Sequence, residues 1–477
     1  MRTHKHWLIG VVGLLAMTVG WGSTAEQTDA TQTETGDLTV WTDYACFRVA
    51  DDPSVTEVEF YFAFKRNEFS FQREPGGLWI AEVGLWVQIL NLQDLPITDT
   101  IAAHFACAVR DSAEVTNPDY KVFYALPIQL PPGPHHARII AMDMYGEAGQ
   151  RKVGELILPV IARDFSSSGL TLSDLKLAYD IDVIETPPDS TRPDVLVRNQ
   201  HKVYPDPRGV MSRNRPQLYF YGEIYNLQFE PGGDNLYELT FRFLIADSVV
   251  VKDFGTRAYK KPGNSSVLAT GLPTADLPEG KFLLEVTVTD PATGSRAAVT
   301  KPFTKLLEIA ADSLTAEQAR QMRDVILYLA KKEELRAYDQ LSLFGKRNFL
   351  LEFWKRYDPT PETPTNEFKD EYFRRFNYAN AKFSSSSGTQ QNGWKTDRGR
   401  VFISYGPPDE IQRYPSSLSE KPWEEWYYFK FGDQGEVYFI FQDEEGFGDL
   451  KLVHSTARGE KRDPEWEKKI REGRLMR

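Results

Sequence analysis

The sequence predicts a multidomain protein in which two all-β sandwiches are followed by an α+β domain with three helices and a small antiparallel sheet. Three observations lead to this fold class. The chain of 477 residues is long enough for about three domains. Its first two thirds contain an internal repeat of strand and turn signals. After about residue 312 the sequence changes to segments rich in helix-forming residues.

The composition is that of an ordinary globular protein, with 41% hydrophobic and 26% charged residues. The net charge of −12 argues against a nucleic-acid partner, because such binding needs a basic surface that displaces counterions. It also argues weakly against docking on anionic lipid. No phosphate loop, dinucleotide fingerprint or zinc-helix motif is present in the sequence, so we expect neither a cofactor nor a metal site.

The amino-terminal segment, residues 1–25, has the features of a secretory signal peptide. A basic start precedes an apolar run at residues 7–19, and Ser23, Thr24 and Ala25 supply the small residues of a cleavage site. The run is short for a membrane span, so a cleaved signal is preferred to an uncleaved anchor. Residues 26–36 are predicted to be a disordered lead-in. We therefore expect an exported protein, periplasmic or extracellular, without a membrane span in its mature part.

An internal repeat organises the next part of the chain. Gly133 follows a Leu-Pro-Pro turn, and Asp143 comes ten residues later. Gly280 follows a Leu-Pro-Glu turn, and Asp290 again comes ten residues later. Between Gly280 and Asp290 apolar and polar residues alternate, which is typical of a strand with one buried face. Each copy is predicted to end with a turn, a strand, a turn and a last strand.

Repeats of this length with many short strands predict two sandwiches of immunoglobulin-like type, at residues 37–163 and 170–306. Further strands are legible in both copies, at residues 58–64, 78–90, 217–225 and 237–246. The favoured role of such sandwiches is scaffolding or protein contact, and carbohydrate binding is the minor alternative.

The only two cysteines, Cys46 and Cys107, both lie in the first predicted sandwich. Export permits a disulfide between them. The sequence leaves open whether they form one structural disulfide or remain two buried thiols. Their spacing matches no metal site, and no neighbouring base indicates a catalytic cysteine.

The third unit, residues 312–458, begins with helices. Thr315 and Gln318 have the spacing of a capping box at the start of the first one. A proline-rich break separates the second helix from the third. The three helices are predicted at residues 315–340, 343–357 and 366–383.

A small sheet is predicted after these helices. Residues 384–388 are interpreted as a flexible loop, and residues 401–405 as a strand. A hairpin is expected to pair residues 426–431 with residues 437–441. The charged tail, residues 459–477, is predicted to be a short helix or disordered.

The most distinctive segment lies between the third helix and the hairpin. It combines two glycines, a tryptophan, an Asp-Arg pair and a Gly-Pro-Pro turn around a short apolar run. It resembles the signature of the GWxTD domain family, which is named for the residue types found here at Gly393, Trp394, Thr396 and Asp397. The resemblance covers roughly residues 330–455 and implies a bacterial envelope protein. The family has no assigned activity, so the resemblance implies no reaction.

The structural interpretation of this segment is that it holds its own domain together. Trp394 would anchor the loop, and Thr396 or Asp397 would cap the following turn. Asp397 would pair with Arg398 or Arg400. The two glycines of the segment, Gly393 and Gly399, would provide a positive φ or a close approach of two backbones.

The functional interpretation treats the polar residues of the same region as a binding surface. The candidate binding residues are Trp394, Asp397, Arg398, Arg400, Asp409 and Glu410. Under this interpretation they recognise a partner segment or an acidic group, and no catalytic residue is assigned.

Two functions follow from the sequence. The preferred one is a non-enzymatic exported cell-envelope protein with a scaffold or interaction role, whose partner is an envelope protein or peptide. A free edge of the predicted hairpin would suit strand addition by that partner. The alternative is an envelope hydrolase acting on glycan or peptide through Asp397, Asp409 and Glu410. Catalysis by such carboxylates requires a defined separation, which the sequence does not specify.

Overall fold

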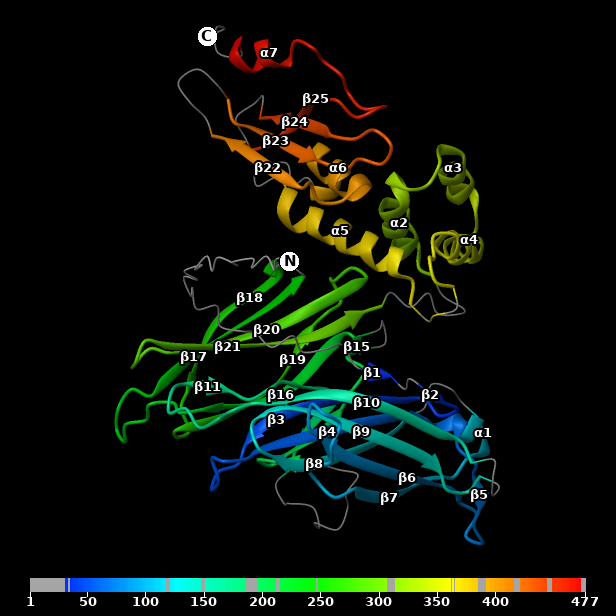
Figure 1. Cartoon of the computed structure of the whole chain (residues 1–477), viewed down its shortest axis with the longest axis vertical. Coiled ribbons are helices and arrows are strands. Elements are labelled where there is room, and N and C mark those ends of the chain that lie inside the picture. Colours follow the sequence, from blue (N-terminus) through cyan, green and yellow to red (C-terminus); the bar gives the residue numbers. More distant parts are fainter. Residues whose placement is uncertain are drawn as a thin grey trace, which may run out of the picture.

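The computed structural model describes residues 31–472 apart from short gaps at 33–34, 117–120, 147–150, 185–195, 212–214, 246–247, 307–313, 362, 364, 385–391, 416–420 and 444–447. The predicted signal peptide, residues 1–25, and most of the predicted loop at 384–388 therefore lie outside the described residues. The chain is mostly β-sheet, with two pairs of facing sheets followed by helices and a fifth sheet (Figure 1).

The first sandwich packs a four-stranded sheet, here sheet A, on a six-stranded sheet, here sheet B. Sheet A has the order β1 (Thr31–Gln32), β3 (Val40–Arg48), β4 (Thr56–Lys65) and β8 (Lys121–Leu130). Sheet B has the order β2 (Thr35–Gly36), β10 (Val153–Ala162), β9 (Gly133–Asp143), β6 (Trp79–Leu90) and β5 (Gln72–Arg73), with β7 (Ile101–Val109) also paired with β6. Short helices η1 (Arg66–Glu68) and α1 (Ser112–Thr116) lie in its connections.

The prediction of a disordered lead-in at residues 26–36 is wrong for its last part. Residues 31–32 form β1, which pairs with β3, and residues 35–36 form β2, which pairs with β10. The segment therefore contributes a strand to each sheet of the first sandwich. The polar composition of the segment did not indicate strands. Strand pairing satisfies backbone donors and acceptors and so does not require apolar side chains.

The second sandwich packs sheet C on sheet D around a second apolar core. Sheet C has the order β11 (Thr171–Leu172), β16 (Gln217–Tyr225), β12 (Lys176–Val183), β14 (His201–Pro205) and β13 (Leu196–Arg198), with β19 (Ser265–Pro273) also paired with β16. Sheet D has the order β15 (Val210–Met211), β21 (Ser295–Lys305), β20 (Gly280–Asp290), β17 (Leu236–Ile245) and β18 (Val249–Lys260).

The internal repeat corresponds to equivalent strands in the two sandwiches. Each copy starts its strand at a glycine with positive φ, Gly133 at 131° and Gly280 at 152°. Each strand ends at a buried aspartate that accepts a backbone amide: Asp143 from Ser70 and Asp290 from Gln228, both at 2.9 Å. The predicted turn, strand, turn and last strand are confirmed in both copies, as β9–β10 and β20–β21.

The two sandwiches stack through the outer faces of sheets A and C, so that sheet A is buried on both sides (Figure 1). Phe47 and Tyr61 from sheet A pack there against Tyr221 of sheet C. This burial explains why β4 is a nearly continuous apolar run rather than an alternating one.

Cys46 and Cys107 are both free thiols. Cys46 lies in β3 of sheet A, where its thiol donates to the carbonyl of Ile161 at 3.4 Å. Cys107 lies in β7 of sheet B, opposite Ala81 of β6. Of the two alternatives that the sequence left open, the structure has unbonded thiols.

The carboxyl-terminal domain contains more helices than the three that were predicted. They are α2 (Ala316–Val325), η3 (Ile326–Tyr328), α3 (Lys332–Gln340), α4 (Leu343–Lys355), α5 (Glu367–Phe383), η4 (Gly393–Lys395), α6 (Asp397–Tyr405) and α7 (Trp466–Glu472). The capping box of Thr315 and Gln318 is confirmed. The single helix expected up to residue 340 is divided because the carboxylate of Glu334 accepts the amide of Lys331 at 2.9 Å and starts a second helix.

The predicted strand at residues 401–405 is wrong, because these residues form the second half of α6. The run Val401, Phe402 and Ile403 has the composition of a strand, but all three side chains are buried as parts of a helix. The N-cap at Thr396 and packing against α5 override the local β preference.

The fifth sheet, here sheet E, has the order β22 (Glu410–Tyr414), β23 (Trp423–Tyr428), β24 (Val437–Gln442) and β25 (Lys451–Ser455). The predicted hairpin is confirmed as β23 and β24, with Trp426 opposite Phe439. The expected free edge is not on this hairpin, because β22 and β25 flank it. The tail predicted to begin at residue 459 belongs to the domain: Ile470 of α7 is buried against Ile440 and Val453 of sheet E.

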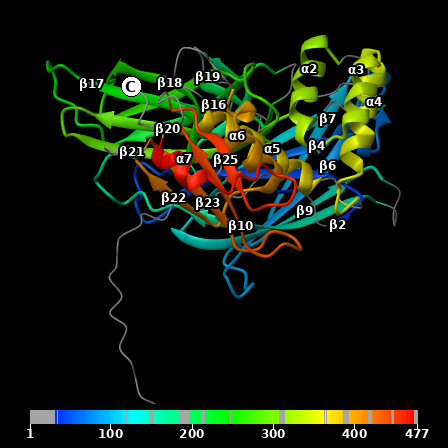
Figure 2. The same cartoon turned by 90° about the horizontal axis from the view of Figure 1, so that it is seen from above.

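Helix α5 joins the carboxyl-terminal domain to the second sandwich (Figures 1 and 2). It contacts β18 and β20 on one side and α6 on the other. Lys369 pairs with Glu279 at 2.6 Å, and the side-chain amide of Asn377 donates to the carbonyl of Glu279 at 3.0 Å. Among the described helices none is long and apolar enough to span a membrane.

Candidate functional site

The candidate segment begins as the single turn η4 and continues as α6, with Thr396 between them. The hydroxyl of Thr396 donates to the carbonyl of Gly393 at 2.8 Å and accepts the amide of Gly399 at 3.0 Å. The side chain is buried. Thr396 is therefore the N-cap of α6 and also ties the helix to the preceding turn.

Gly393 and Gly399 are required by close contact between backbones. A Cβ on Gly393 would lie 2.0 Å from the carbonyl oxygen of Ala379 in α5. A Cβ on Gly399 would lie 2.0 Å from the carbonyl oxygen of Gly393. Neither glycine has a positive φ, so of the two predicted reasons only the close approach applies.

Trp394 is buried in the helical core and is not part of an exposed surface. Its ring stacks on Phe376 of α5 at a centroid distance of 5.7 Å and meets Tyr328 edge to face at 6.1 Å. Its backbone carbonyl accepts the hydroxyl of Tyr328 at 2.9 Å, and its amide donates to Asn380 at 3.1 Å. Trp394 therefore anchors the segment to two helices.

Asp397 connects α6 to sheet E. Its carboxylate accepts the backbone amide of Leu452 in β25 at 2.8 Å. This bond satisfies a strand amide, which explains why an acidic residue suits this position. Neither Arg398 nor Arg400 pairs with Asp397, so the predicted local ion pair is wrong.

Arg400 instead pairs with Glu460, which the sequence had assigned to the tail. The guanidinium donates two hydrogen bonds of 2.7 Å to the two carboxylate oxygens, and the hydroxyl of Tyr405 donates a third of 2.7 Å. Burial raises the pKa of Glu460, but these three donors outweigh it and hold the pKa below its ordinary value of 4.5. Burial also raises the pKa of Tyr405, to about 12.

Arg398 lies between a ring and a carboxylate. Its guanidinium sits 5.2 Å from the ring centroid of Phe383 and 3.5 Å from the carboxylate of Glu424 in β23. Burial lowers the pKa of Arg398 despite this carboxylate. Because the side chain is mostly buried, it serves the packing of α6 on the sheet.

Asp409 and Glu410 lie at the start of β22. The carboxylate of Asp409 accepts a hydrogen bond from the backbone amide of Phe429 at 2.7 Å. The backbone amide of Asp409 donates to the backbone carbonyl of Tyr427 at 2.8 Å. Glu410 is exposed and accepts the side-chain amide of Gln412 at 2.9 Å. Of the six candidate residues, Glu410 is the one that remains available on the surface without fixing the backbone.

The structure does not bring the three candidate carboxylates together. Asp397 contacts β25 at one end of sheet E, whereas Asp409 and Glu410 lie at β22 at the other end. Three interstrand spacings separate these strands, about 14 Å. Among the described residues, no group of three or more histidine, cysteine or acidic side chains is placed to hold a metal ion.

A shallow pocket of about 380 Å³ opens beside Glu410 on sheet E. Aromatic and acidic side chains share its lining, and Phe429 is half exposed at its rim. The lining residues are Glu410, Gln412, Tyr427, Tyr428, Phe429, Glu436, Val437, Tyr438 and Thr456. The sequence predicted β23 and β24 of this surface but not β22, and only the sheet order shows which side chains share it.

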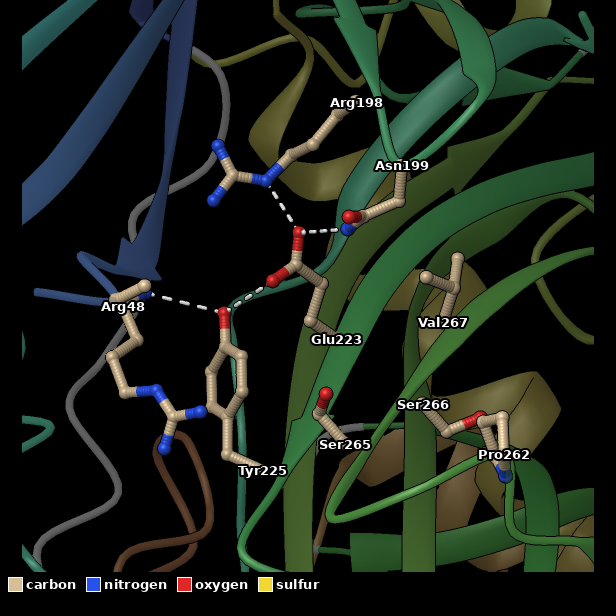
Figure 3. A pocket seen from close by; sticks show the side chains of 10 residues that line it. Arg48, Arg198, Asn199, Glu223, Tyr225, Pro262, Ser265, Ser266 and Val267 are labelled. Carbon is tan, nitrogen blue, oxygen red and sulfur yellow. Dashed lines mark hydrogen bonds and ion pairs between the residues drawn. The ribbon is translucent and has the colours of Figure 1, made fainter.

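A second pocket of about 330 Å³ lies between the sandwiches (Figure 3). The carboxylate of Glu223 at its centre accepts hydrogen bonds from the guanidinium of Arg198, from the side-chain amide of Asn199 at 3.0 Å and from the hydroxyl of Tyr225 at 2.8 Å. Arg198 also bonds to Glu57 and Glu59 of sheet A. Arg198 and the three glutamates are paired with one another across the boundary between sheets A and C. The charged groups of this pocket therefore serve the contact between the two sandwiches.

These features define a class of protein: stacked β-sandwiches carrying an α+β domain whose signature residues hold its helices on its sheet. A family model, the GWxTD domain, matches residues 302–474. The carboxyl-terminal part of the chain therefore carries a GWxTD domain, which confirms the resemblance found in the sequence.

None of the curated proteins matches this chain. Two solved structures are similar at 8% identity. Red sea bream transglutaminase aligns over 58% of this chain and 32% of its own, with a TM-score of 0.15. Parabacteroides merdae beta-glucuronidase aligns over 57% of this chain and 34% of its own, with a TM-score of 0.16. The aligned part is thus about a third of each of those proteins.

Proposed function

We propose that the chain is a non-enzymatic exported cell-envelope protein that binds an extended segment of an envelope protein through the carboxyl-terminal domain. The two sandwiches, which we take to be immunoglobulin-like, act as a rigid support for that domain. Export rests on the signal-like sequence of residues 1–25.

The observation that carries this proposal is that the charged residues of the GWxTD region hold the domain's own strands and side chains in place. Asp397 holds β25, Asp409 holds the chain after β23, and Arg400 holds Glu460. A catalytic acid or base has to be free to reach a substrate. Since these groups are occupied by backbone amides and each other, they support a structural role.

The binding surface we assign is β22 with the pocket beside it. Strand β22 ends sheet E and, in the described part of the chain, pairs on one side only, with β23. A terminal strand is the usual place where an extended segment adds to a sheet. Glu410 and Glu436, together with the rings of Tyr427 and Tyr438, favour a segment that carries a basic side chain.

Site-specific photo-crosslinking in living cells tests this assignment. A photoreactive amino acid at Gln412 in β22 is expected to give a discrete adduct, because a bound segment would lie within reach of that side chain. The matched control is the same amino acid at Ala258 in β18, which is also the last strand of its sheet. Mass spectrometry of the adduct identifies the partner and the segment attached.

Equal labelling from both positions, or none from Gln412, would contradict binding at β22. The non-enzymatic part fails on a different result. Purified protein that hydrolyses a cell-wall or peptide substrate, and loses this activity on Asp409→Asn without loss of melting temperature, would show that the carboxylate serves chemistry.

A further inference from the structure

Large apolar side chains are exposed at the corner between α3 and α4 and further along α4. Leu341 is 37% exposed, Leu343 42%, Phe344 66% and Leu351 47%. The inner face of α4 is well buried through Leu350, Phe353 and Trp354, so the exposed side chains are not needed for that core. A contiguous apolar patch on a soluble domain marks an interaction surface more often than scattered apolar residues do.

The same helical hairpin is basic, although the whole chain has a net charge of −12. Between residues 331 and 356 there are seven basic and four acidic side chains: Lys331, Lys332, Arg336, Lys346, Arg347, Lys355 and Arg356 against Glu333, Glu334, Asp339 and Glu352. Two of the acidic groups are neutralised locally, Glu334 by Arg356 and Asp339 by Arg323. In the described part of the chain, Arg336 and Lys355 are exposed and have no ion pair.

The apolar and basic residues share one line along α4. Leu343, Arg347, Leu351 and Lys355 follow one another at intervals of four residues, so they lie on the same side of the helix. Apolar groups flanked by Lys and Arg are the pattern of helices that lie in a membrane interface. The aliphatic stems of such basic side chains reach along the apolar layer while their charges meet lipid phosphates.

The shape of this corner also favours a flat partner. Figures 1 and 2 both place α3 and α4 at the outer end of the domain, on the side away from β22. Leu341 lies in the short connection between the two helices and is exposed there. A projecting corner can enter a lipid surface without rearrangement of the fold.

We propose that the α3–α4 corner docks on the surface of an anionic phospholipid bilayer. Leu341, Leu343 and Phe344 enter the interface, and Arg336, Arg347 and Lys355 face the headgroup phosphates. This contact is independent of the protein partner proposed at β22, because the two surfaces lie on opposite sides of the domain. It requires no membrane span, and the local positive charge overcomes the repulsion expected from the net charge.

Vesicle co-sedimentation of the full chain without residues 1–25 tests the proposal. We expect the protein to sediment with phosphatidylcholine vesicles that contain about a third phosphatidylglycerol, and much less with phosphatidylcholine alone. Raised salt should weaken the binding. The double variant Leu343→Ser/Phe344→Ser should bind about tenfold more weakly or worse, since each side chain contributes apolar burial. Arg336→Glu/Lys355→Glu should abolish the preference for phosphatidylglycerol.

The matched control is Leu92→Ser/Leu95→Ser, which changes two leucines that are 54% and 60% exposed in the first sandwich. This variant should bind as the unchanged protein does. All variants should keep the melting temperature, because the altered side chains are exposed. Absence of binding to the anionic vesicles, or equal losses in the control and the corner variant, would overturn the proposal. A protein partner bound at this corner in place of lipid would overturn it as well.

Discussion

At the scale of single residues, the signature of this domain is a set of anchors. Trp394 was predicted both as an anchor and as a candidate binding residue, and its burial confirms the anchor. Of the two residues predicted as a possible cap, Thr396 or Asp397, the structure has Thr396. The partners of the charged residues were not predictable. Arg400 meets Glu460 from the other end of the domain, and no local pattern reports so distant a pairing.

The Arg400–Glu460 pair gives a prediction at this scale. Glu460→Gln should cost about 2 kcal/mol near neutral pH, because it removes a carboxylate that accepts three hydrogen bonds. The folded-state pKa of Glu460 lies below its ordinary value of 4.5. Its contribution is therefore fully present above about pH 4.5 and is lost as the pH falls through the folded-state pKa.

Urea unfolding at several pH values measures this effect. The difference in unfolding free energy between the unchanged protein and Glu460→Gln should shrink on acidification. The control is Glu352→Gln, an exposed residue of α4, which should have almost no effect at any pH. A difference that stays constant down to about pH 3 would mean that ionisation of Glu460 is not what stabilises the domain.

At the scale of elements, the sequence predicted strands better than helix boundaries. The repeated strands β9–β10 and β20–β21 carry a clear period of two and glycine turns, so both copies were found. Helix α6 was read as a strand because its second half is rich in β-branched and aromatic residues. The contacts that make it a helix are tertiary: α6 lies so close to η4 that only glycine fits at position 399, and η4 lies so close to α5 that only glycine fits at position 393.

This close approach gives a prediction for α6. Gly399→Ala should destabilise the domain by about 3 kcal/mol, because its new Cβ would lie 2.0 Å from the carbonyl oxygen of Gly393 and the helix would have to move. Gly263→Ala is the control, since nothing lies within 4 Å of a Cβ there. Chemical denaturation of the two variants compares them. Equal stability of both would show that α6 can shift without cost.

At the scale of the whole molecule, the sandwiches are joined by charge as well as by apolar packing. Lys176 of sheet C and Glu59 of sheet A are almost fully buried, at 1% and 3% side-chain exposure, and lie 3.1 Å apart. Glu59 also accepts Tyr61 at 2.7 Å. The sequence predicted two sandwiches but not that their outer faces meet, because a lysine or glutamate in a strand is ordinarily taken as solvent-facing.

The joint gives a prediction at this scale. Lys176→Met should cost about 3 kcal/mol, because it leaves the carboxylate of Glu59 buried with one cation fewer. Lys176→Met/Glu59→Met should be no less stable than the single variant, because two apolar side chains can fill the same space. Urea unfolding followed by tryptophan fluorescence measures both. If the single variant unfolds at the same urea concentration as the unchanged protein, the pair does not hold the sandwiches together.

The contact between α5 and the second sandwich has a practical consequence for anyone who isolates the carboxyl-terminal module. The family match begins at residue 302, inside β21, and so takes the end of a sheet D strand with it. A fragment that begins there would contain part of β21 without its partner strand β20. It would also expose the side of α5 that contacts Glu279 in the intact chain. We therefore expect the module to be soluble only when it is expressed in one polypeptide with the second sandwich.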